Sequence, residues 1–223
     1  LGAYVYYDAS KPEEPASKQE KLFTGFDLDK VQELTVTATN GETTTVKKVG
    51  EGWQITAPVT DRAADTEVIG LAGSMGQLEI VRVIDEKPTD LAQYGLEKPR
   101  IAISYIADGG KNTGKIAIGE KSPTGNGLYA RRNDEPRVFL IPAFQETILN
   151  RNTFDLRDKL IVHLQRDKVE AIEVASESGA VAFKKAGTDW LITAPLQARA
   201  DNSTVEGLVG RVETAQMKAL VTS

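Results

Sequence analysis

The chain has 223 residues, which is enough for one large or two modest domains. A hydrophobic content of 40% and a charged content of 26% are typical of a folded soluble region and exclude a disordered or fully membrane-embedded chain. The absence of cysteine excludes disulfides, a thiol nucleophile and cysteine-ligated zinc, and a net charge of −5 without a cluster of Lys or Arg argues against nucleic acid binding.

The chain begins with an uncharged run, LGAYVYY, that contains three tyrosines. A bilayer takes about 20 residues to span, so this run resembles only the end of a spanning helix, with Tyr4, Tyr6 and Tyr7 at the membrane interface. The following residues are rich in Pro, Glu, Lys and Ser, as a solvated stalk is. We therefore expect residues 1–21 to be the end of a membrane anchor plus a stalk. The alternative is that the run pairs as an edge strand.

A six-residue phrase occurs twice, as WQITAP at Trp53–Pro58 and as WLITAP at Trp190–Pro195. At the offset of 137 residues between the two tryptophans, ten of the nineteen positions of Trp53–Leu71 are identical to their counterparts. The likeness continues upstream after a slip of one residue, between Lys30–Lys48 and Lys168–Lys185. This self-similarity predicts an internal duplication.

Each copy has the pattern of three strands and a helix. Two alternating apolar and polar segments are separated by Asn40-Gly41 or Ser178-Gly179, dipeptides that are typical of hairpin turns. The repeated phrase is then a third strand, which its proline ends because proline cannot donate to a strand ladder. A helix follows, and we expect Asp65 to cap it in the first copy and residues 201–203 in the second.

The segment between the copies has a different pattern. Four alternating stretches (residues 100–108, 115–119, 127–132 and 137–142) predict an antiparallel β-meander, and a short helix is expected over Phe144–Asn150. The predicted fold is therefore α+β, with duplicated β-β-β-α modules flanking an antiparallel β-meander.

The expected domains follow from this order. A complete first unit spans residues 22–160, with the module in 22–84 and the meander and short helix in 85–160. A partial second unit, the module alone, spans 161–223. Its meander is absent from the sequence, so either the polypeptide continues beyond Ser223 or the two copies are unequal.

The order of these motifs resembles the DUF4340 family of bacterial envelope proteins. The resemblance rests on W-x-ITAP, then YGL-x-x-P, I-x-IG and G-x-YA, and finally LRDK. It implies an extracytoplasmic α+β region behind one N-terminal membrane helix, anchored in the cytoplasmic membrane, and a context similar to auxiliary components of gliding-motility-type ABC transporters. It implies no catalytic residue and no cofactor.

Candidate catalytic motifs are weak. GGKNTGK (Gly109–Lys115) has phosphate-loop spacing, but Ile116 follows it in place of a Ser or Thr, and strands rather than a helix flank it. His163 is the single histidine, and the alternation of LIVHLQ predicts a structural or surface position beside apolar residues. The carboxylate pairs Asp27 with Asp29 and Asp85 with Glu86 are better explained as turn and capping residues than as glycosidase acids.

Two arginines, Arg62 and Arg199, occupy equivalent positions before the two helices. They are candidates for contact with an anion or a partner, as are Tyr4, Tyr6 and Tyr7; the alternative is that each guanidinium is tied to a nearby carboxylate or carbonyl. Trp53 and Trp190 are expected to be buried on their strands.

These observations predict a non-enzymatic, membrane-tethered, extracytoplasmic accessory or scaffolding subunit of a bacterial membrane protein complex, with integral membrane proteins as partners. The alternative is an extracytoplasmic ligand-binding module, for glycan, lipid or peptide, that serves a transporter. No metal, cofactor or nucleic acid is expected, and a small ligand is the less favoured partner.

Overall fold

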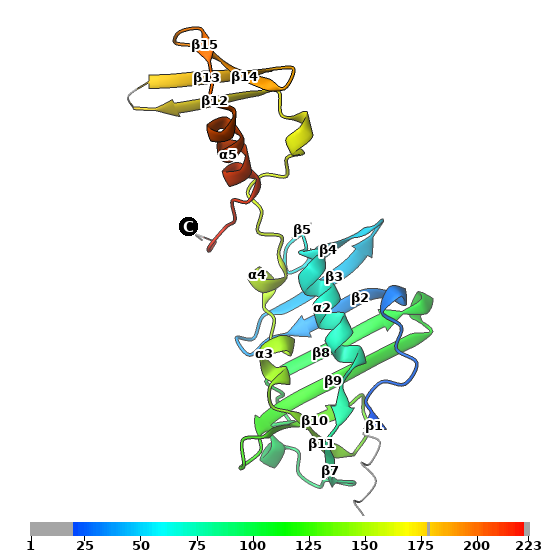
Figure 1. Ribbon diagram of the computed structural model, residues 1–223. Helices are drawn as coiled ribbons and strands as arrows, with labels where there is room; N and C mark the ends of the chain where they lie inside the picture. Colours follow the sequence, from blue (N-terminus) through cyan, green and yellow to red (C-terminus); the bar gives the residue numbers. More distant parts are fainter. Residues whose placement is uncertain (1–19, 178, 221–223) are drawn as a thin grey trace, which may run out of the picture. The chain divides into compact units, whose positions relative to one another are not determined.

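The computed structural model describes residues 20–177 and 179–220, and the chain divides into two compact units, residues 1–158 (unit 1) and 159–223 (unit 2) (Figure 1). The fold is α+β, as the sequence predicts. The expected anchor, with Tyr4, Tyr6 and Tyr7, and Ser178 of the second hairpin turn lie outside the described residues. Within the described ranges, every helix is too short or too polar to cross a membrane.

Unit 1 is built on a nine-stranded sheet in the order β5-β4-β3-β2-β8-β9-β10-β11-β7, with all neighbouring strands antiparallel. A two-stranded ribbon, β1-β6, lies beside it. The strands are β1 (Glu20–Lys21), β2 (Val31–Thr37), β3 (Thr43–Val49), β4 (Gly52–Ala57), β5 (Asp61–Arg62), β6 (Glu79–Ile80), β7 (Arg82–Asp85), β8 (Ile101–Ala107), β9 (Asn112–Lys121), β10 (Gly127–Arg132) and β11 (Val138–Pro142).

The module and the meander share this sheet because β2 pairs with β3 on one side and with β8 on the other. Val36 of β2 lies opposite Ile103, and Leu34 lies opposite Tyr105. The four meander strands then follow in chain order from β8 to β11. The first strand of the module is therefore an interior strand of unit 1, with both of its edges paired.

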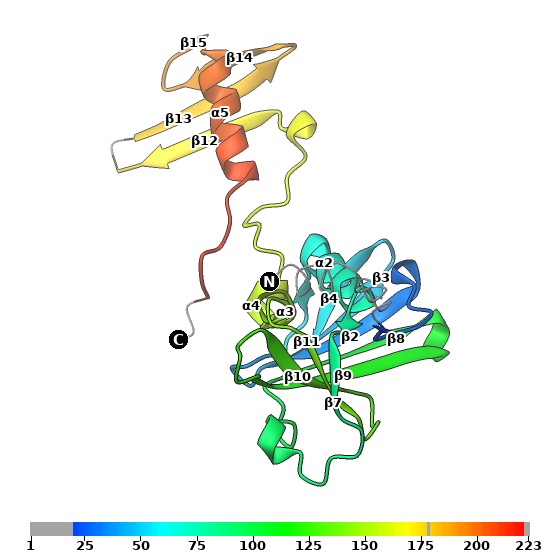
Figure 2. The same cartoon turned by 60° about the horizontal axis from the view of Figure 1, so that its bottom comes forward.

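One face of the sheet carries the helices α2 (Asp65–Gly76), α3 (Gln145–Leu149) and α4 (Thr153–Leu156) (Figure 2). Because side chains alternate along a strand, branched apolar residues point toward these helices and form a single core. The other face carries a threonine ladder, with Thr35 Oγ1 3.1 Å from Thr45 Oγ1 and Thr37 Oγ1 3.0 Å from Thr43 Oγ1.

Unit 2 is a four-stranded antiparallel sheet in the order β12-β13-β14-β15, with one helix packed on it. Its elements are β12 (Ala171–Ser176), β13 (Gly179–Ala186), β14 (Asp189–Ala194), β15 (Ala198–Arg199) and α5 (Asn202–Glu213). Among the described residues of this unit, four buried residues form the core: Trp190, Ala200, Val205 and Val209. Short 3-10 helices precede the first sheet strand in each unit, η1 (Leu28–Lys30) and η4 (Arg166–Lys168). Two more lie in the meander, η2 (Ala92–Tyr94) and η3 (Asp108–Gly110).

The structure corrects several predicted details. Each repeated phrase is followed by a fourth short strand, β5 or β15, that the alternation pattern did not reveal because it has only two residues. Strand β9 begins at Asn112, so the glycine-rich turn after β8 is much shorter than expected. His163 lies in an exposed segment outside the helices and strands, so its surface position is as expected, but the strand alternation predicted for LIVHLQ is not observed.

Candidate functional site

The repeated phrase of unit 1 forms strand β4, which has a bulge in its ladder with β3, and the turn that leads into β5. Trp53 on β4 is buried, and the ladder between β3 and β4 shifts register between Thr45 and Val46. Beside this bulge, Thr56 Oγ1 donates to the carbonyl of Thr45 at 3.3 Å. The peptide bond between Ala57 and Pro58 is cis, and the chain returns as β5.

The helix that follows is tied back to the tryptophan. The Trp53 amide donates to Asp65 Oδ1 at 2.8 Å, and the Trp53 carbonyl accepts from the Ala63 amide at 3.2 Å. Asp65 is therefore not the capping residue that the sequence predicts, because Ala64 occupies the N-cap position without a side-chain bond. Its carboxylate instead joins the first helical turn to the strand.

Unit 2 repeats these contacts with different side chains. The Trp190 amide donates to Asn202 Oδ1 at 2.8 Å, and the Trp190 carbonyl accepts from the Ala200 amide at 2.9 Å. Thr193 Oγ1 donates to the Ala182 carbonyl at 3.3 Å, beside an equivalent bulge, and the peptide bond between Ala194 and Pro195 is cis. Here the predicted cap is confirmed, since Asp201 accepts from the Thr204 amide. In both units the phrase positions a strand, a turn and a helix, and its tryptophan is buried as predicted.

The two units provide a matched test of the strand-to-helix bond. We expect Asp65→Asn to leave the stability of unit 1 within about 0.5 kcal/mol, because Asn202 makes the same bond with an amide oxygen. Asp65→Ala should cost about 1–2 kcal/mol, because it leaves the Trp53 amide without its acceptor. Urea unfolding followed by tryptophan fluorescence measures both; equal losses for the two variants would contradict this role.

Three family motifs of the meander meet at one place. A Cβ atom on Gly119 of β9 would overlap the carbonyl oxygen of Tyr94, and one on Gly95 would lie 2.9 Å from the Glu120 amide nitrogen. The ring of Tyr94 packs edge-on against that of Tyr129 at a centroid distance of 5.0 Å. The YGL, I-x-IG and G-x-YA motifs therefore form one packing contact between the loop before β8 and the strands β9 and β10.

The charges near this contact are paired. Glu146 of α3 accepts from Arg100 Nη2 at 2.7 Å and lies 2.7 Å from Lys121 Nζ. The hydrogen bond from Lys121 and then that from Arg100 hold the pKa of Glu146 below its usual value, although partial burial opposes them. Burial, and next the nearby carboxylate of Asp85, raises the pKa of the Tyr94 hydroxyl. These groups are arranged as structural ion pairs and hydrogen bonds.

The LRDK motif (Leu156–Lys159) bonds to the chain around β5 of the first module. The Asp158 amide donates to the Arg62 carbonyl at 2.9 Å, and the Ala64 amide donates to the Leu156 carbonyl at 2.8 Å. Arg157 Nε also lies 3.1 Å from Asp61 Oδ2. This segment therefore runs along the outer edge of β5 and covers it.

The arginines predicted as partner contacts have different surroundings. Arg199 is exposed and its Nη2 lies 3.1 Å from Asp189 Oδ2, which is the intramolecular alternative weighed for it. The pKa of Asp189 is lowered first by the hydrogen bond from Asn202 and then by Arg199. Arg62 is exposed as well, but Gly52 stands where unit 2 has Asp189, so the equivalent ion pair cannot form. Neither arginine lines the pocket of unit 1 or the groove of unit 2 that are described below.

The structure also shows where the weaker catalytic candidates lie. GGKNTGK forms the tip of the β8–β9 hairpin, where Gly109 and Gly110 have positive φ, and no helix follows it. Asp27 caps η1, and Asp85 accepts from the Lys87 amide and from the Tyr94 hydroxyl. In residues 20–177 and 179–220, no group of three or more His, Asp or Glu side chains is placed to hold a metal ion.

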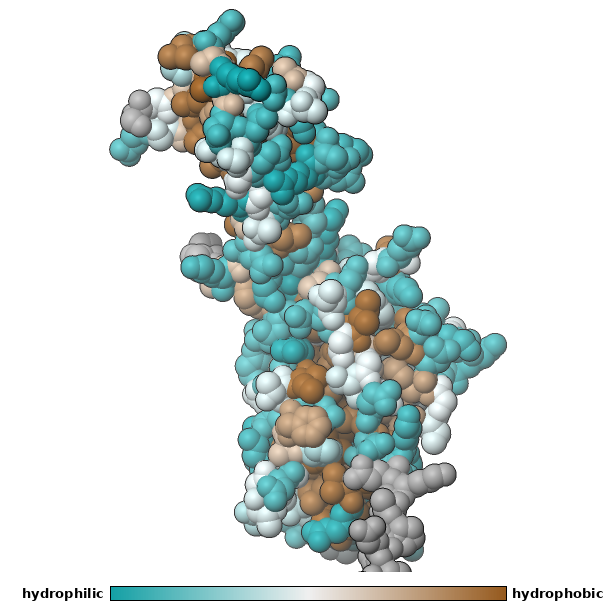
Figure 3. Space-filling model, in the orientation of Figure 1, coloured by the Kyte–Doolittle hydropathy of each residue, from teal (hydrophilic) through white to brown (hydrophobic). Residues whose placement is uncertain are grey.

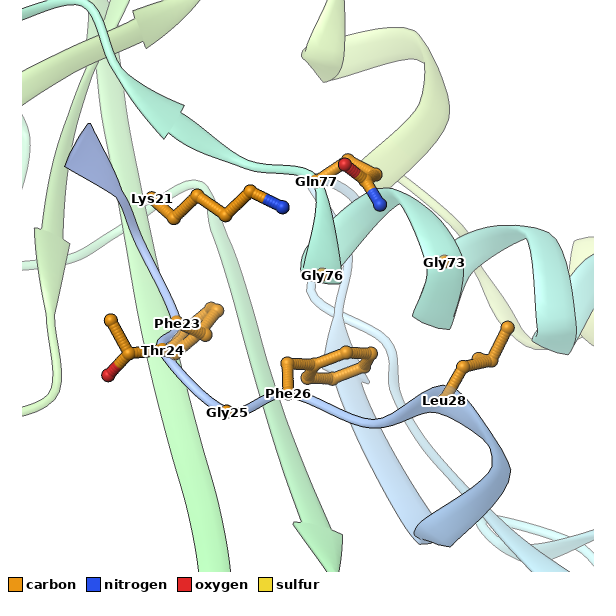
Figure 4. Close-up of a pocket in the computed structure, with 9 residues that line it drawn as sticks. All are labelled: Lys21, Phe23, Thr24, Gly25, Phe26, Leu28, Gly73, Gly76 and Gln77. Carbon is orange, nitrogen blue, oxygen red and sulfur yellow. The ribbon is translucent and has the colours of Figure 1, made fainter. Parts of the chain in front are cut away.

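A pocket of about 390 Å³ lies in unit 1 at the end of α2. Figure 4 shows the rings of Phe23 and Phe26 below the helix end and Lys21 reaching toward it. A Cβ atom on Gly76 would lie 2.8 Å from Phe26 Cε1, so glycine lets the ring approach. A lysine near the C-terminal end of a helix is favoured by the helix dipole, which gives Lys21 a structural role.

A larger apolar groove, of about 590 Å³, lies in unit 2 between β12 and α5. Its walls include Leu164, Val169, Ile172, Val174, Leu208 and Val212. Apolar residues are visible beside α5 on the face that Figure 3 draws. Sequence reasoning missed this groove, although the pattern contained a signal, because both modules carry apolar residues at equivalent positions.

The burial of equivalent residues measures how open this groove is. Val36 of β2 is 0% exposed, whereas its counterpart Val174 of β12 is 44% exposed. Met75 of α2 is 0% exposed, whereas Val212 of α5 is 46% exposed. In unit 1 the apolar side chains of β8 belong to the same core cluster as Val36 and Met75. In unit 2 no described strand lies beside β12 on the side away from β13.

The charged side of unit 2 lies around Glu206. Trp190 Nε1 donates to Glu206 Oε1 at 2.8 Å, and Arg166 Nε donates to Glu206 Oε2 at 3.1 Å. The bond from Trp190, followed by that from Arg166, lowers the pKa of Glu206. This carboxylate therefore anchors the buried indole and η4 to α5.

Comparison with known proteins gives one result. The family described as "Domain of unknown function (DUF4340)" matches residues 53–223, well over half of the chain. Neither a curated protein nor a solved structure was found to match. On the strength of this match and of the converging motifs, the chain belongs to the DUF4340 family.

Proposed function

We propose that this protein is a non-enzymatic accessory or scaffolding subunit of a bacterial membrane protein complex. The observation that carries the proposal is the apolar groove of unit 2, which borders a strand that pairs on one side within the described part of the chain. Exposed apolar surface next to free backbone donors and acceptors is the chemistry of a protein-binding surface. An enzyme would need reactive groups converging on a cavity, whereas the charged walls of this groove are only Glu173 and Arg211.

We also propose that the two units carry copies of one duplicated module. The supporting evidence is the set of equivalent contacts: the strand-to-helix bond, the threonine bond at the bulge and the register of the return strand recur at the same offset. In each unit a backbone bond also joins the segment before the first sheet strand to the segment after the helix. The Leu22 amide donates to the Leu78 carbonyl, and the Ile161 amide donates to the Ala215 carbonyl. Duplication would give the second copy a surface that evolved to bury a following strand.

The membrane setting is part of the proposal. The apolar, tyrosine-rich residues 1–7 and the stalk-like residues after them support a tether in the cytoplasmic membrane with both units outside the cytoplasm. The family resemblance supports an association with an ABC-type transporter. In this setting the groove of unit 2 is the contact surface for an integral membrane protein.

Site-specific photocrosslinking in the native cell tests the proposal. With p-benzoylphenylalanine in place of Val174, we expect a discrete crosslink to an integral membrane protein identified by mass spectrometry. The same residue in place of Leu191, which is 39% exposed on a different strand, should give no such product. Equal crosslinking from both positions, or none from either, would contradict the scaffold. A co-purified small molecule in place of a protein would support the ligand-binding alternative, for which the pocket near Phe26 is the candidate site.

A further inference from the structure

The pocket at the end of α2 is elongated and has one charged end. In Figure 4 the segment from Lys21 to Leu28 runs beside the last turn of α2, with the rings of Phe23 and Phe26 between its two ends. Of the described residues that line the pocket, Lys21 alone carries a charge. The volume of about 390 Å³ falls in the range of pockets that hold small molecules.

Glycine keeps this pocket open. Gly73 and Gly76 of α2 both line it. The approach of Phe26 accounts for Gly76, because a Cβ atom there would lie 2.5 Å from Phe26 Cδ1. Gly73 has no such neighbour, since the atom nearest to its Cβ would be Leu28 Cδ2 at 4.0 Å. Glycine is unfavourable within a helix, so neither packing nor helix propensity explains Gly73, and a side chain there would enter the pocket.

Unit 2 shows that the equivalent helix face has a long side chain lying across it. Gly210 of α5 is the counterpart of Gly73, and Arg166 is the counterpart of Leu28 after the slip of one residue. A Cβ atom on Gly210 would lie 3.7 Å from Arg166 Nη1, and Arg166 Nη2 lies 3.0 Å from Glu206 Oε2. Leu28 is shorter than arginine, so in unit 1 the corresponding space is the pocket.

The same comparison shows that the space in unit 1 is apolar. Ile69 stands where unit 2 has Glu206, and Gly76 stands where unit 2 has Glu213, so both carboxylates that pair with Arg166 are replaced by uncharged residues. Ile69 is 46% exposed and lies one helical turn before Gly73, which extends the apolar surface of Phe26 and Leu28 along α2. An occupant of this space needs an apolar body.

Lys21 determines the charge of the occupant at the other end. Its side chain is exposed and forms no salt bridge in the described part of the chain, and its cross-strand neighbour Glu79 does not line the pocket. The negative end of the α2 dipole disfavours an anion that has no cation beside it. A carboxylate or phosphate bound here therefore depends on the Lys21 ammonium.

We infer that this pocket binds a monomeric amphiphile with one alkyl chain and one anionic head. The alkyl chain lies over Phe26, Gly73 and Leu28, and the carboxylate or phosphate head pairs with Lys21. At roughly 30 Å³ for each heavy atom, the share of a water molecule in the liquid, the pocket has room for a chain of about ten carbons. This site goes beyond the proposed scaffold and is independent of it, because the partner surface belongs to unit 2.

Isothermal titration calorimetry of the whole protein in detergent-free buffer tests the site, with decanoate as the probe. We expect saturable binding with a Kd below about 0.1 mM. Acetate, which lacks the chain, and decyltrimethylammonium, which reverses the charge of the head, should each bind at least about tenfold more weakly. Absence of saturable decanoate binding up to about 1 mM, or equal binding of decyltrimethylammonium, would overturn the inference.

Two glycine variants locate the chain. Gly73→Leu places a side chain in the pocket and should weaken decanoate binding about tenfold or more. Gly70→Leu is the matched control on the same helix, because Gly70 does not line the pocket and a Cβ atom there has nothing within 4 Å. Both changes introduce a better helix former, and circular dichroism checks that both variants fold. Equal affinities for the two variants would overturn the site.

Lys21→Met locates the head, because it removes the charge and keeps an unbranched apolar side chain. We expect decanoate to bind about threefold to tenfold more weakly, the effect of losing one exposed ion pair. Binding of decyltrimethylammonium should not weaken. An unchanged affinity for decanoate would overturn the pairing of the head with Lys21.

Sedimentation with phosphatidylglycerol vesicles separates a lipid in a bilayer from a monomeric amphiphile. We expect the wild-type protein and Gly73→Leu to bind the vesicles equally. Loss of vesicle binding in Gly73→Leu, without decanoate binding in the wild type, would assign the pocket to a bilayer lipid and overturn the inference. Decanoate binding without a crosslink from position 174 would contradict the scaffold alone, and a crosslink without decanoate binding would contradict this site alone.

Discussion

Trp190→Ala is expected to unfold unit 2 while leaving unit 1 folded. Trp190 is 1% exposed and is the largest of the four buried residues that form the core in the described part of unit 2. Removal of a buried indole costs about 3–5 kcal/mol, which is comparable to the whole stability of a small unit. The variant also removes the donor that anchors Glu206, so α5 loses a second contact to the sheet.

Limited proteolysis with mass spectrometry measures this outcome. We expect rapid cleavage within residues 159–223 and a protected fragment that ends near Asp158, with the fluorescence of Trp53 unfolding at the wild-type midpoint. Leu191→Ala is the control, because it removes an exposed side chain next to Trp190 on the same strand. Proteolysis of Trp190→Ala at the wild-type rate would contradict the role of the indole.

Gly119→Ala is expected to lower the stability of unit 1 by about 3 kcal/mol. The new Cβ would overlap the carbonyl oxygen of Tyr94 and lie 2.9 Å from the carbonyl carbon of Gly95. Both are backbone atoms, so rotation of a side chain cannot relieve the contact. The loop before β8 must therefore move away from β9, and the contact between Tyr94 and Tyr129 should be lost with it.

Urea unfolding and near-UV circular dichroism measure the two effects. The matched control is Gly70→Ala in α2, where a Cβ has nothing within 4 Å. That change should raise stability by up to about 1 kcal/mol through helix propensity. Unfolding of both variants at the same urea concentration would contradict the claim that the close contact between the YGL and I-x-IG motifs requires glycine at position 119.

The contrast between the two units is the basis of the partner surface that we propose. The modules share their strand order, their bulge and their strand-to-helix bond. Within residues 20–177 and 179–220, both edges of the module are covered in unit 1, whereas β12 of unit 2 pairs on one side. Segment 156–158 runs along β5, and β8 pairs with β2. In unit 2, the apolar side chains of Val174 and Val212 are exposed, which is why we propose the partner contact there.

The sequence alone determined the local elements and the family. Alternating residues and turn dipeptides predicted the strands of the meander within a few residues of their observed ends, because these preferences act between near neighbours in the chain. The repeated phrase and the motif order indicated the family in the same way. The cap at Asp201 was predicted correctly. Asp65 was predicted to cap its helix but accepts from the Trp53 amide instead, because the same carboxylate can make either bond.

Only the tertiary structure decided which strands meet. The pairing of β2 with β8 joins segments about 70 residues apart, and no local pattern states which strand edge is free. The same limit hid the contact of Gly119 with Tyr94 and the exposure of Val174, whose counterpart Val36 has the same residue type but is fully buried. Identical side chains became core in one unit and an open groove in the other, because burial depends on the strand that arrives from elsewhere in the chain or from a partner.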